Sequence, residues 1–160
     1  MTETAKLAGN GRLLSLLASV FVVPWPATAA DCARKTLIAE VTPVRDGDTI
    51  ELGSMAIRFE GIAAPERSEP GGNEATAAIE ALVLGKEVRC ELTGKRTYDR
   101  CVAVRYLNGA DIEAIMVRQV FARDCPRYSG GRHAEAECQA AAEGATIGRI
   151  SPLPGYCHPR

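Results

Sequence analysis

The alternation of apolar and polar positions predicts strands in the first third of the chain beyond residue 30. Branched apolar residues alternate with polar ones in residues 37–44, 49–52 and 55–62, and turn residues such as glycine and aspartate separate the three segments. Alternation with a period of two is typical of β-strands, and short turns favour antiparallel neighbours. We therefore predict a three-stranded antiparallel meander over residues 37–62.

A second hairpin and several helices complete the pattern. Residues 88–92 and 101–107 alternate in the same way on either side of a glycine-containing loop. Apolar residues recur at helical spacing in three further segments, residues 74–85, 112–121 and 133–143. Asp111 is the expected N-cap of the middle helix, because its short side chain can accept from the first unpaired backbone N–H groups.

The order of these elements indicates the fold class. Short strands with inserted helices suit a small Greek-key barrel of the OB type. We expect a mainly β fold with helices (α+β), namely a five-stranded OB-type barrel with about three α-helices. Residues 31–160 are expected to form a single domain that ends in a tail rich in proline and glycine, since no long linker or internal repeat divides them.

The amino terminus has the pattern of an export signal. Lys6 and Arg12 precede an apolar run at residues 13–23, and small residues follow at 27–29. A membrane anchor is the alternative, but a span needs roughly 20 apolar residues and this run is shorter. We therefore predict that residues 1–30 are a cleaved secretory signal and that the mature chain is periplasmic or secreted, without a membrane span.

The cysteines agree with export, because all six lie beyond the predicted cleavage point. An even count in an exported chain favours disulfides. A zinc site is the alternative, but it would need closely spaced pairs of cysteine or histidine, which do not occur. The sequence does not choose among the possible pairings, and our working hypothesis is Cys90 with Cys101, Cys125 with Cys138, and Cys32 with Cys157.

The charge of the chain is balanced, with 19 basic and 20 acidic residues and a formal net charge of −1. Any hold on nucleic acid must therefore be local and not a product of the overall field. A possible local rim surrounds the second hairpin and consists of Lys86, Arg89, Lys95, Arg96, Arg100 and Arg105. We expect Lys95 and Arg96 to bind substrate phosphates, although a solvated hairpin is the usual explanation of such a run.

Three motifs follow one another in an informative order. Residues 46–49 read Asp-Gly-Asp-Thr, residues 58–66 begin with arginine and end in Pro-Glu, and residues 98–100 read Tyr-Asp-Arg. In sequence and spacing these motifs resemble the staphylococcal nuclease (thermonuclease-like) family, and the resemblance extends over residues 37–144. It implies a five-stranded OB barrel with three helices that hydrolyses DNA and RNA phosphodiester bonds with calcium.

The resemblance implies catalytic roles for two arginines and a glutamate. Arg58 and Arg100 are expected to bind the scissile phosphate, for which a planar and permanently charged fork is suited. Glu66 is expected to orient or deprotonate the attacking water. Surface arginines in weak ion pairs and a solvated Glu66 are the alternatives. Tyr98 matches a substrate-binding tyrosine that bonds to a phosphate or stacks on a base, and a core tyrosine is its alternative.

The metal site implied by the resemblance is incomplete. Asp48 matches a metal-ligating aspartate, and Ala64 offers its backbone carbonyl. Ala63 stands where family members usually carry a further aspartate ligand. Calcium takes about six to eight oxygens, so we expect a weak Ca²⁺ site that the substrate completes. Glu60 lies on the strand face of Arg58 and is a candidate replacement for the missing acid, with a salt bridge to a basic residue as the alternative.

Two functions from different classes follow. The first is an exported calcium-dependent nuclease that acts as a monomer on single-stranded DNA or RNA. The second is a non-catalytic OB module that binds nucleic acid or another polyanion, which Ala63 and the slightly acidic charge favour. The nuclease requires that Arg58, Arg100, Glu66 and Asp48 surround a single phosphorus atom.

Overall fold

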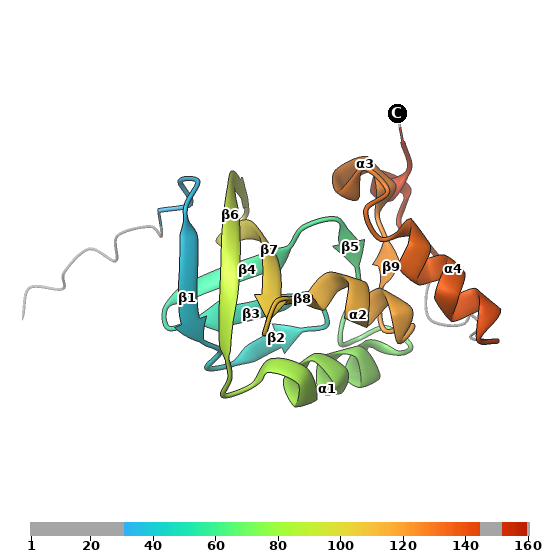
Figure 1. The fold of residues 1–160 in the computed structure, drawn as a ribbon, viewed down its shortest axis with the longest axis horizontal. Coiled ribbons are helices and arrows are strands. Elements are labelled where there is room, and N and C mark those ends of the chain that lie inside the picture. Colours follow the sequence, from blue (N-terminus) through green and yellow to red (C-terminus); the bar gives the residue numbers. More distant parts are fainter. Residues whose placement is uncertain (1–30, 145–151, 160) are drawn as a thin grey trace, which may run out of the picture.

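A computed structural model of the chain describes residues 31–144 and 152–159 (Figure 1). The predicted export signal, residues 1–30, lies outside the described residues. Across the described part of the chain, no helix is both long and apolar enough to cross a membrane.

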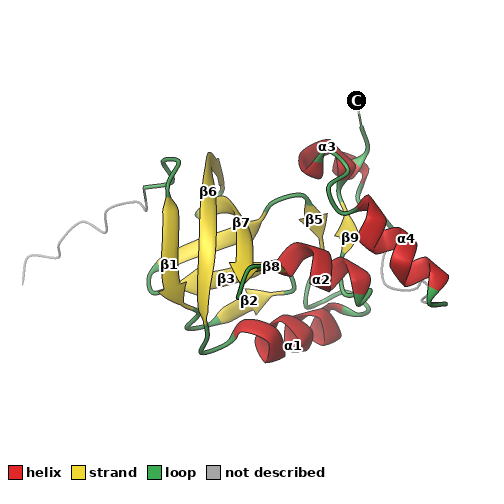
Figure 2. Cartoon of the chain, in the orientation of Figure 1, coloured by secondary structure: helices red, strands yellow, loops and turns green. Residues whose placement is uncertain are grey.

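A seven-stranded sheet forms the centre of the domain (Figure 2). Its strands follow the order β1, β6, β7, β4, β3, β2, and β8 pairs with β7. Their bounds are β1 Thr36–Glu40, β2 Val44–Asp46, β3 Thr49–Leu52, β4 Met55–Phe59, β6 Glu87–Thr97, β7 Arg100–Leu107 and β8 Ala110–Asp111. Neighbouring strands are antiparallel except β4 and β7, which run parallel.

The predicted α+β fold of the OB type is confirmed, but the sheet has seven strands instead of the predicted five. The predicted meander exists as β2, β3 and β4, but the first predicted strand breaks after β1, which pairs with β6 instead. The predicted second hairpin is β6 with β7. The path of the sheet ends at β1 and β2, and in the described residues no pairing joins these two strands, so the sheet is not a closed barrel.

The three longer helices are those that the sequence predicts. They are α1 Gly72–Val83, α2 Ile112–Arg118 and α4 Ala134–Ala142. Asp111 caps α2 as predicted, since its Oδ1 accepts from the Ala114 N–H at 3.0 Å. A further short helix, α3 Pro126–Ser129, lies between α2 and α4 and is not among the predicted helices.

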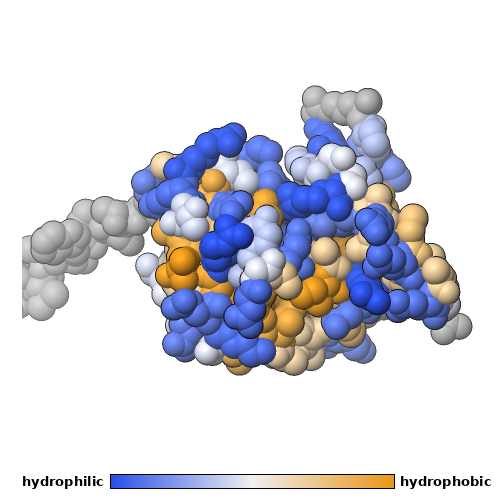
Figure 3. All heavy atoms as spheres, viewed as in Figure 1, coloured by the Kyte–Doolittle hydropathy of each residue, from blue (hydrophilic) through white to orange (hydrophobic). Residues whose placement is uncertain are grey.

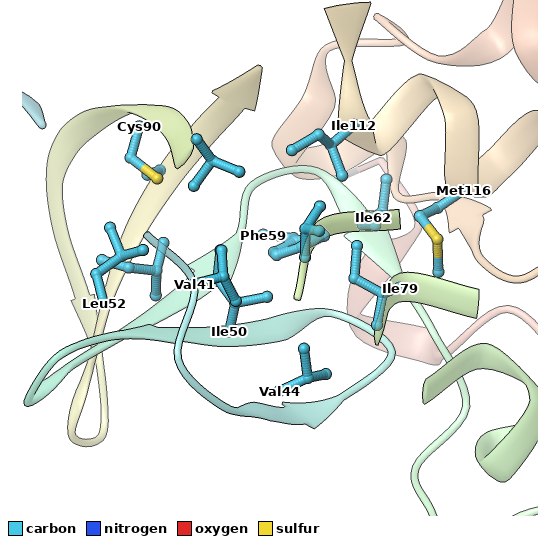
Figure 4. Packing of buried hydrophobic residues seen from close by; sticks show 14 of the residues in the cluster. Val41, Val44, Ile50, Leu52, Phe59, Ile62, Ile79, Cys90, Ile112 and Met116 are labelled. Carbon is cyan, nitrogen blue, oxygen red and sulfur yellow. The ribbon is translucent and has the colours of Figure 1, made fainter. Parts of the chain in front are cut away.

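The core lies between the sheet and the helices α1 and α2 (Figure 4). Its side chains include Ile50, Phe59 and Ile62 from the strands, Ile79 from α1, and Ile112 and Met116 from α2. Burying one such side chain stabilises the fold by about 1.5 to 3 kcal/mol. Because these residues must face inward, alternation fixes which side chains of β3, β4 and β7 face the other way.

Arg105 belongs to this core and not to the basic rim that the sequence suggests. It is fully buried, pairs with the equally buried Glu113, and places its guanidinium 3.3 Å from the centre of the Phe59 ring. Burial lowers the pKa of Arg105, and the neighbouring carboxylate opposes that effect. The rim prediction is wrong for this residue, because Arg105 lies on the inward face of β7.

The disulfides differ from our working hypothesis. The structure joins Cys32 to Cys101 and Cys125 to Cys157, and leaves Cys90 buried and Cys138 exposed as free thiols. All three hypothesised pairs are therefore wrong, although disulfides are present as predicted.

Strand register explains the difference at the hairpin. Cys90 lies opposite Arg105 in the ladder of β6 and β7, whereas Cys101 lies opposite Arg96. Each cysteine thus faces an arginine several residues away from the other cysteine, so the hairpin holds the two cysteines apart. Cys32 instead reaches Cys101, with 5.2 Å between their Cα atoms.

A small second unit stands beside the main sheet. It pairs β5 (Ile62–Ala63) with β9 (Arg123–Asp124), and Figure 1 shows α3, α4 and the C-terminus grouped around it. Gly61, with φ of 79°, lets α3 approach, since a Cβ there would lie 2.6 Å from the Cβ of Ser129. The close contact seats α3 on the turn between β4 and β5.

The surface is mostly hydrophilic with scattered apolar patches. Figure 3 shows such patches over β1 and near α2 on the face that it presents. The large apolar or aromatic side chains exposed among the described residues are Ile38, Leu84, Tyr98, Tyr128 and Tyr156. Tyrosines therefore make up most of this set.

Candidate functional site

Thr49, Arg58 and Arg100 lie on one face of three adjacent strands. Thr49 and Arg58 are direct partners in the ladder of β3 and β4, and Arg58 is the partner of Val102 in the parallel ladder of β4 and β7. Arg100 precedes Val102 by two residues, and side chains two apart in a strand share a face. Both strand neighbours of Arg58 are buried in the core. The three side chains therefore meet on the side of the sheet away from that core.

A continuous chain of contacts links the two arginines. Arg100 Nη1 donates to Thr49 Oγ1 at 3.1 Å, and this hydroxyl donates to Asp48 Oδ1 at 3.1 Å. Asp48 forms an ion pair with Arg58, and its Oδ2 accepts from the Ala64 N–H at 3.2 Å. Thr49 is fully buried and Asp48 is 4% exposed, so little water weakens these contacts. The structure thus brings Arg58, Arg100 and Asp48 together.

The turn before β3 fixes the Asp48 carboxylate. The Asp48 N–H donates to Asp46 Oδ1 at 3.0 Å, which is an Asx-type turn. A Cβ on Gly47 would lie 2.7 Å from the Ala64 Cβ and 2.8 Å from the Ala75 Cβ. Only glycine fits this close packing between α1 and the segment after β5, and the packing holds the turn in place.

The Arg58 guanidinium is largely enclosed. Its side chain is 15% exposed, and Nη2 donates to the Ile62 carbonyl at 3.3 Å. Burial lowers the pKa of Arg58 to about 10, Tyr156 opposes this shift, and Arg100 adds to it by repulsion. The group stays protonated at neutral pH. A guanidinium carries more N–H donors than the contacts with Asp48 and Ile62 use, so it can still bind an anion.

Arg100 and Tyr98 lie at the turn between β6 and β7. Tyr98 is 87% exposed and has φ of 54°, which is uncommon for a residue other than glycine. The Arg100 guanidinium lies 6.0 Å from its ring centre, at the outer range of a cation–π contact. Arg45 bonds to both Asp99 and Glu51 and so ties this turn to β3. The alternative of a core tyrosine is wrong for Tyr98.

Glu66 lies exposed on the loop before α1. Its backbone N–H donates to Glu69 Oε2 at 2.9 Å, and its carbonyl accepts from the Glu69 N–H at 2.8 Å. Gly72 packs against it so closely that a Cβ there would lie 1.8 Å from the Glu66 carbonyl oxygen. These contacts fix the Glu66 backbone, and its carboxylate is accessible to solvent.

The predicted basic rim is divided between structural and exposed residues. Lys95 pairs with Glu60 at 2.9 Å, so Glu60 takes the alternative role of a salt-bridge partner. Arg96 is exposed one residue further along β6. Lys86 donates to carbonyl groups near the end of α1, and Arg89 stacks on an aromatic ring. Of the predicted rim, Lys95 and Arg96 thus remain as exposed basic residues near Arg100 in the hairpin.

The residues around Asp48 do not fit a resident calcium ion. Both Asp48 oxygens already engage Arg58, Thr49 or the Ala64 N–H. Ala63 contributes a buried methyl group where a carboxylate would be needed. Calcium takes about six to eight oxygens. Within the part of the chain that the structure describes, no group of three or more His, Cys, Asp or Glu side chains could hold a metal ion.

Ala63 belongs instead to a small apolar cluster. It is 5% exposed and packs with Cys125 and Cys157, and Leu153 covers them. A carboxylate at this position would enter the apolar surroundings of these side chains, which is costly unless the group is paired. Ala63 therefore packs against the disulfide that anchors the C-terminal segment.

Sequence reasoning missed two residues of this region. Thr49 stands in the first motif, but its bridging role depends on the register of β3, β4 and β7. Tyr156 stands in the tail, and only the Cys125–Cys157 disulfide and the packing of Cys157 on Ala63 place this tail against β5, whose Ile62 carbonyl accepts from Arg58. A sequence alone carries no local signal for either contact.

Comparison with known proteins settles the family. The model of the family described as "Staphylococcal nuclease homologue" matches residues 56–151, which is more than half of the chain. The chain belongs to the staphylococcal nuclease family. The resemblance inferred from the three motifs is thereby confirmed. Of the network residues, Arg58 and Arg100 lie within the residues that the model of this staphylococcal nuclease homologue family matches.

Curated relatives include bacterial and plant proteins. An "Uncharacterized endonuclease" of Haemophilus influenzae is 32% identical over 122 residues, which are 73% of this chain and 66% of that protein. "Succinoglycan biosynthesis protein ExoI" of Rhizobium meliloti is 29% identical over 132 residues, 75% of this chain and 69% of that protein. "Staphylococcal-like nuclease CAN1" of Arabidopsis thaliana is 31% identical over 94 residues, 58% of this chain and 29% of that protein. This staphylococcal nuclease homologue thus matches only part of the length of each relative.

Proposed function

We propose that this staphylococcal nuclease homologue is an exported hydrolase of phosphodiester bonds in single-stranded DNA or RNA. The observation that supports it is the contact chain from Arg100 through Thr49 and Asp48 to Arg58. Two guanidinium groups on one sheet face repel each other, and Asp48 offsets only part of that charge. A phosphate bound between Arg58 and Arg100 would neutralise the remainder.

In the proposed reaction the arginines act on the charge of the phosphate. Arg58 and Arg100 bind its non-bridging oxygens and stabilise the negative charge that grows on them in the transition state. Asp48 holds Arg58 in position, and Thr49 holds Arg100. Glu66 accepts a proton from the attacking water as its oxygen bonds to phosphorus. The bond from phosphorus to the leaving oxygen breaks, and solvent supplies the proton that this oxygen takes up.

We propose that the protein binds no calcium until the substrate is bound. Two observations support this: Asp48 is engaged by Arg58, and Ala63 supplies no oxygen ligand. A substrate phosphate brings oxygens of its own. The weak Ca²⁺ site expected from the sequence, with Asp48 and the Ala64 carbonyl, would therefore have to form together with the substrate.

Export to the periplasm or the exterior forms part of the proposal. It is supported by the two disulfides, Cys32–Cys101 and Cys125–Cys157. Disulfides persist in oxidising compartments and are rare in the cytosol. We further expect the mature chain to be a monomer.

One observation favours a second candidate function, a module that binds polyanions without cleaving them. The ion pair between Asp48 and Arg58 occupies the carboxylate that the resemblance assigns to metal. In addition, the relative ExoI is named for biosynthesis and not for cleavage of nucleic acid. Such a module would use Arg58 and Arg100 for binding only.

Incubation of the disulfide-intact protein with a labelled single-stranded oligonucleotide tests the proposal. We expect shorter labelled fragments to accumulate with time when calcium is present. A separate arm with calcium chelated measures whether cleavage needs the ion. Stable binding without fragments in both arms would contradict the hydrolase and favour the binding module.

A further inference from the structure

The C-terminal segment, residues 152–159, is anchored to the second unit of the fold. Its short 3-10 helix η2, Gly155–Cys157, ends in the disulfide to Cys125. Cys157 is fully buried and packs with Ala63 of β5. The disulfide thus holds the tail against the strand β5.

The strand β5 also supports the two charged groups of the site. Ile62 accepts from Arg58 through its carbonyl at 3.3 Å, and Ala64 donates to Asp48 through its N–H at 3.2 Å. Ala63 stands between these two residues, so its side chain contacts the disulfide while its neighbours contact the ion pair. The tail therefore contacts Ala63, and the two chain neighbours of Ala63 bind Arg58 and Asp48.

Tyr156 projects from this tail toward solvent. It is 51% exposed although the next residue, Cys157, is fully buried. The next residue, Cys157, packs on Ala63, which follows the Ile62 carbonyl that accepts from Arg58, and Tyr156 raises the pKa of Arg58 against the larger lowering effect of burial. Tyr98 is 87% exposed and lies beside Arg100. One exposed ring therefore lies beside Arg100, and a second is carried by the tail that packs on β5, the strand that accepts from Arg58.

We propose that Tyr156 stacks on a base of a single-stranded nucleic acid whose phosphate is bound by Arg58, so that the disulfide-anchored tail forms one wall of the substrate site. The inference rests on the proposed function, because it takes Arg58 as a phosphate ligand. Aromatic rings bind single strands with little dependence on sequence, since every base offers a flat face. A duplex keeps its bases stacked inside, so Tyr156 selects single strands.

The anchoring makes Tyr156 suitable for this role. A ring on a loose tail loses conformational entropy when it binds, which weakens the contact. The disulfide between Cys125 and Cys157 removes most of that freedom before the substrate arrives. The wall therefore depends on the oxidised state of these two cysteines.

Equilibrium binding tests the proposal without any need for turnover. The probe is a fluorescent oligothymidylate with phosphorothioate linkages, which resist hydrolysis, and anisotropy reports its Kd. We expect Tyr156→Ala to raise Kd about 5- to 150-fold, the range that corresponds to the loss of one stacked base. Tyr156→Phe keeps the ring and should stay within about twofold of the unsubstituted protein.

Tyr128→Ala is the matched control. Tyr128 is also an exposed tyrosine, 46% exposed on α3, and its ring carries the neighbouring Arg127 guanidinium at 5.5 Å. We expect its Kd to be unchanged. An unchanged Kd for Tyr156→Ala, an equal loss for Tyr128→Ala, or a Phe variant as weak as the Ala variant would each overturn the proposal.

An abasic oligonucleotide of the same length separates stacking from contact with phosphate. The unsubstituted protein and Tyr156→Ala should bind this probe equally, because it has no base to stack. If the substitution weakens binding of the abasic probe as strongly as that of oligothymidylate, the stacking role is wrong.

Removal of the anchor gives an independent test. A variant with both Cys125→Ser and Cys157→Ser should bind oligothymidylate as weakly as Tyr156→Ala, and addition of Tyr156→Ala to it should cause no further loss. Circular dichroism checks that this variant is folded, and if it is not, the Ala and Phe variants of Tyr156 decide alone. If adding Tyr156→Ala raises Kd as much as it does in the unsubstituted protein, the ring acts without its anchor and the proposed disulfide-anchored wall is wrong.

Failure of this inference and failure of the proposed function give different results. If the unsubstituted protein binds oligothymidylate through Tyr156 but never cleaves an ordinary oligonucleotide, the hydrolase is wrong and the wall stands. If it cleaves while Tyr156→Ala leaves Kd unchanged, the wall is wrong and the hydrolase stands.

Discussion

Arg100 donates a hydrogen bond from Nη1 to Thr49 Oγ1 at 3.1 Å, which joins two residues 51 positions apart in the chain. The hydroxyl has a single proton, and it donates this proton to Asp48. Thr49 is thus the residue that connects Arg100 to the ion pair of Asp48 with Arg58. Thr49 is fully buried, so these hydrogen bonds are shielded from water.

Thr49→Val should therefore lower both stability and activity. Valine keeps the shape but removes the hydroxyl, and hydrogen bonds to charged groups contribute about 1.5 to 3 kcal/mol each to the free energy of unfolding. We expect a loss in that range by urea denaturation, together with a lower kcat because Arg100 loses its support.

Thr76→Val is the control for that substitution. Thr76 is also buried, and its Oγ1 donates to the Gly72 carbonyl at 2.8 Å within α1. Its neutral hydrogen bond should be worth only about 0.5 to 1.5 kcal/mol, and kcat should not change. Equal effects of the two valine substitutions on kcat would contradict the bridging role of Thr49.

Asp111 should make stability depend on pH in the acid range. Its Oδ2 lies 3.8 Å from His133 Nε2, and its Oδ1 accepts from the Ala114 N–H. Burial works in the opposite direction, but the contacts with His133 and Ala114 prevail and lower the pKa of Asp111 from 3.8 to about 2. A carboxyl group whose pKa is lower in the folded state stabilises the fold above its unfolded pKa, and this stabilisation is lost as the pH falls through the folded pKa.

Asp111→Asn isolates that contribution. Asparagine preserves the N-cap of α2 and removes only the charge. We expect the unsubstituted protein to exceed the variant by about 2 kcal/mol in the free energy of unfolding at neutral pH, and this difference to vanish between about pH 4 and pH 2. Urea denaturation at a series of pH values measures it. A difference that stays constant over this range would show that the charge of Asp111 is not the cause.

Ala63→Asp should make the protein respond to calcium. The new carboxylate enters the apolar cluster of the Cys125–Cys157 disulfide, so we expect the free energy of unfolding without metal to fall by about 1 to 3 kcal/mol. Calcium bound between this carboxylate and Asp48 should restore part of the loss, because a ligand that binds only the folded state stabilises it.

Thermal unfolding with and without millimolar calcium measures this response. The unsubstituted protein should show no calcium-dependent change in Tm, since its residues do not form a metal cage. An identical response of both proteins to calcium would mean that position 63 is not adjacent to the metal position implied by the family.

Local patterns predicted most of the fold. The strand predicted at residues 49–52 is β3 with the same bounds, and Asp111 caps α2. The segment predicted as one strand at residues 55–62 is instead β4 followed by a turn at Gly61 and the start of β5. Gly61 adopts positive φ in this turn and lies against α3, a contact that comes from far along the chain.

The site was predictable only where residues act near their own motif. Arg58 lies on the face away from the core because strand alternation decides it, and this is visible in the sequence. The bridge through Thr49 and the approach of Tyr156 depend on strand register and on a disulfide between distant cysteines. The hypothesised Cys90–Cys101 disulfide failed for the same reason, since the register of β6 and β7 places Cys90 opposite Arg105 and Cys101 opposite Arg96.

The central claim is that Arg58 and Arg100 act together on one phosphate. Single-turnover cleavage of a fluorescent single-stranded oligonucleotide tests it most directly, with the variants Arg58→Ala and Arg100→Ala. The control is Arg118→Ala, because Arg118 is an exposed residue of α2 that pairs with Glu143 at 2.9 Å. We expect each of the first two substitutions to lower the rate about 10²- to 10³-fold and the control to leave it unchanged. Unsubstituted protein that binds the oligonucleotide without cutting it, or arginine variants that cut at the full rate, would contradict the claim.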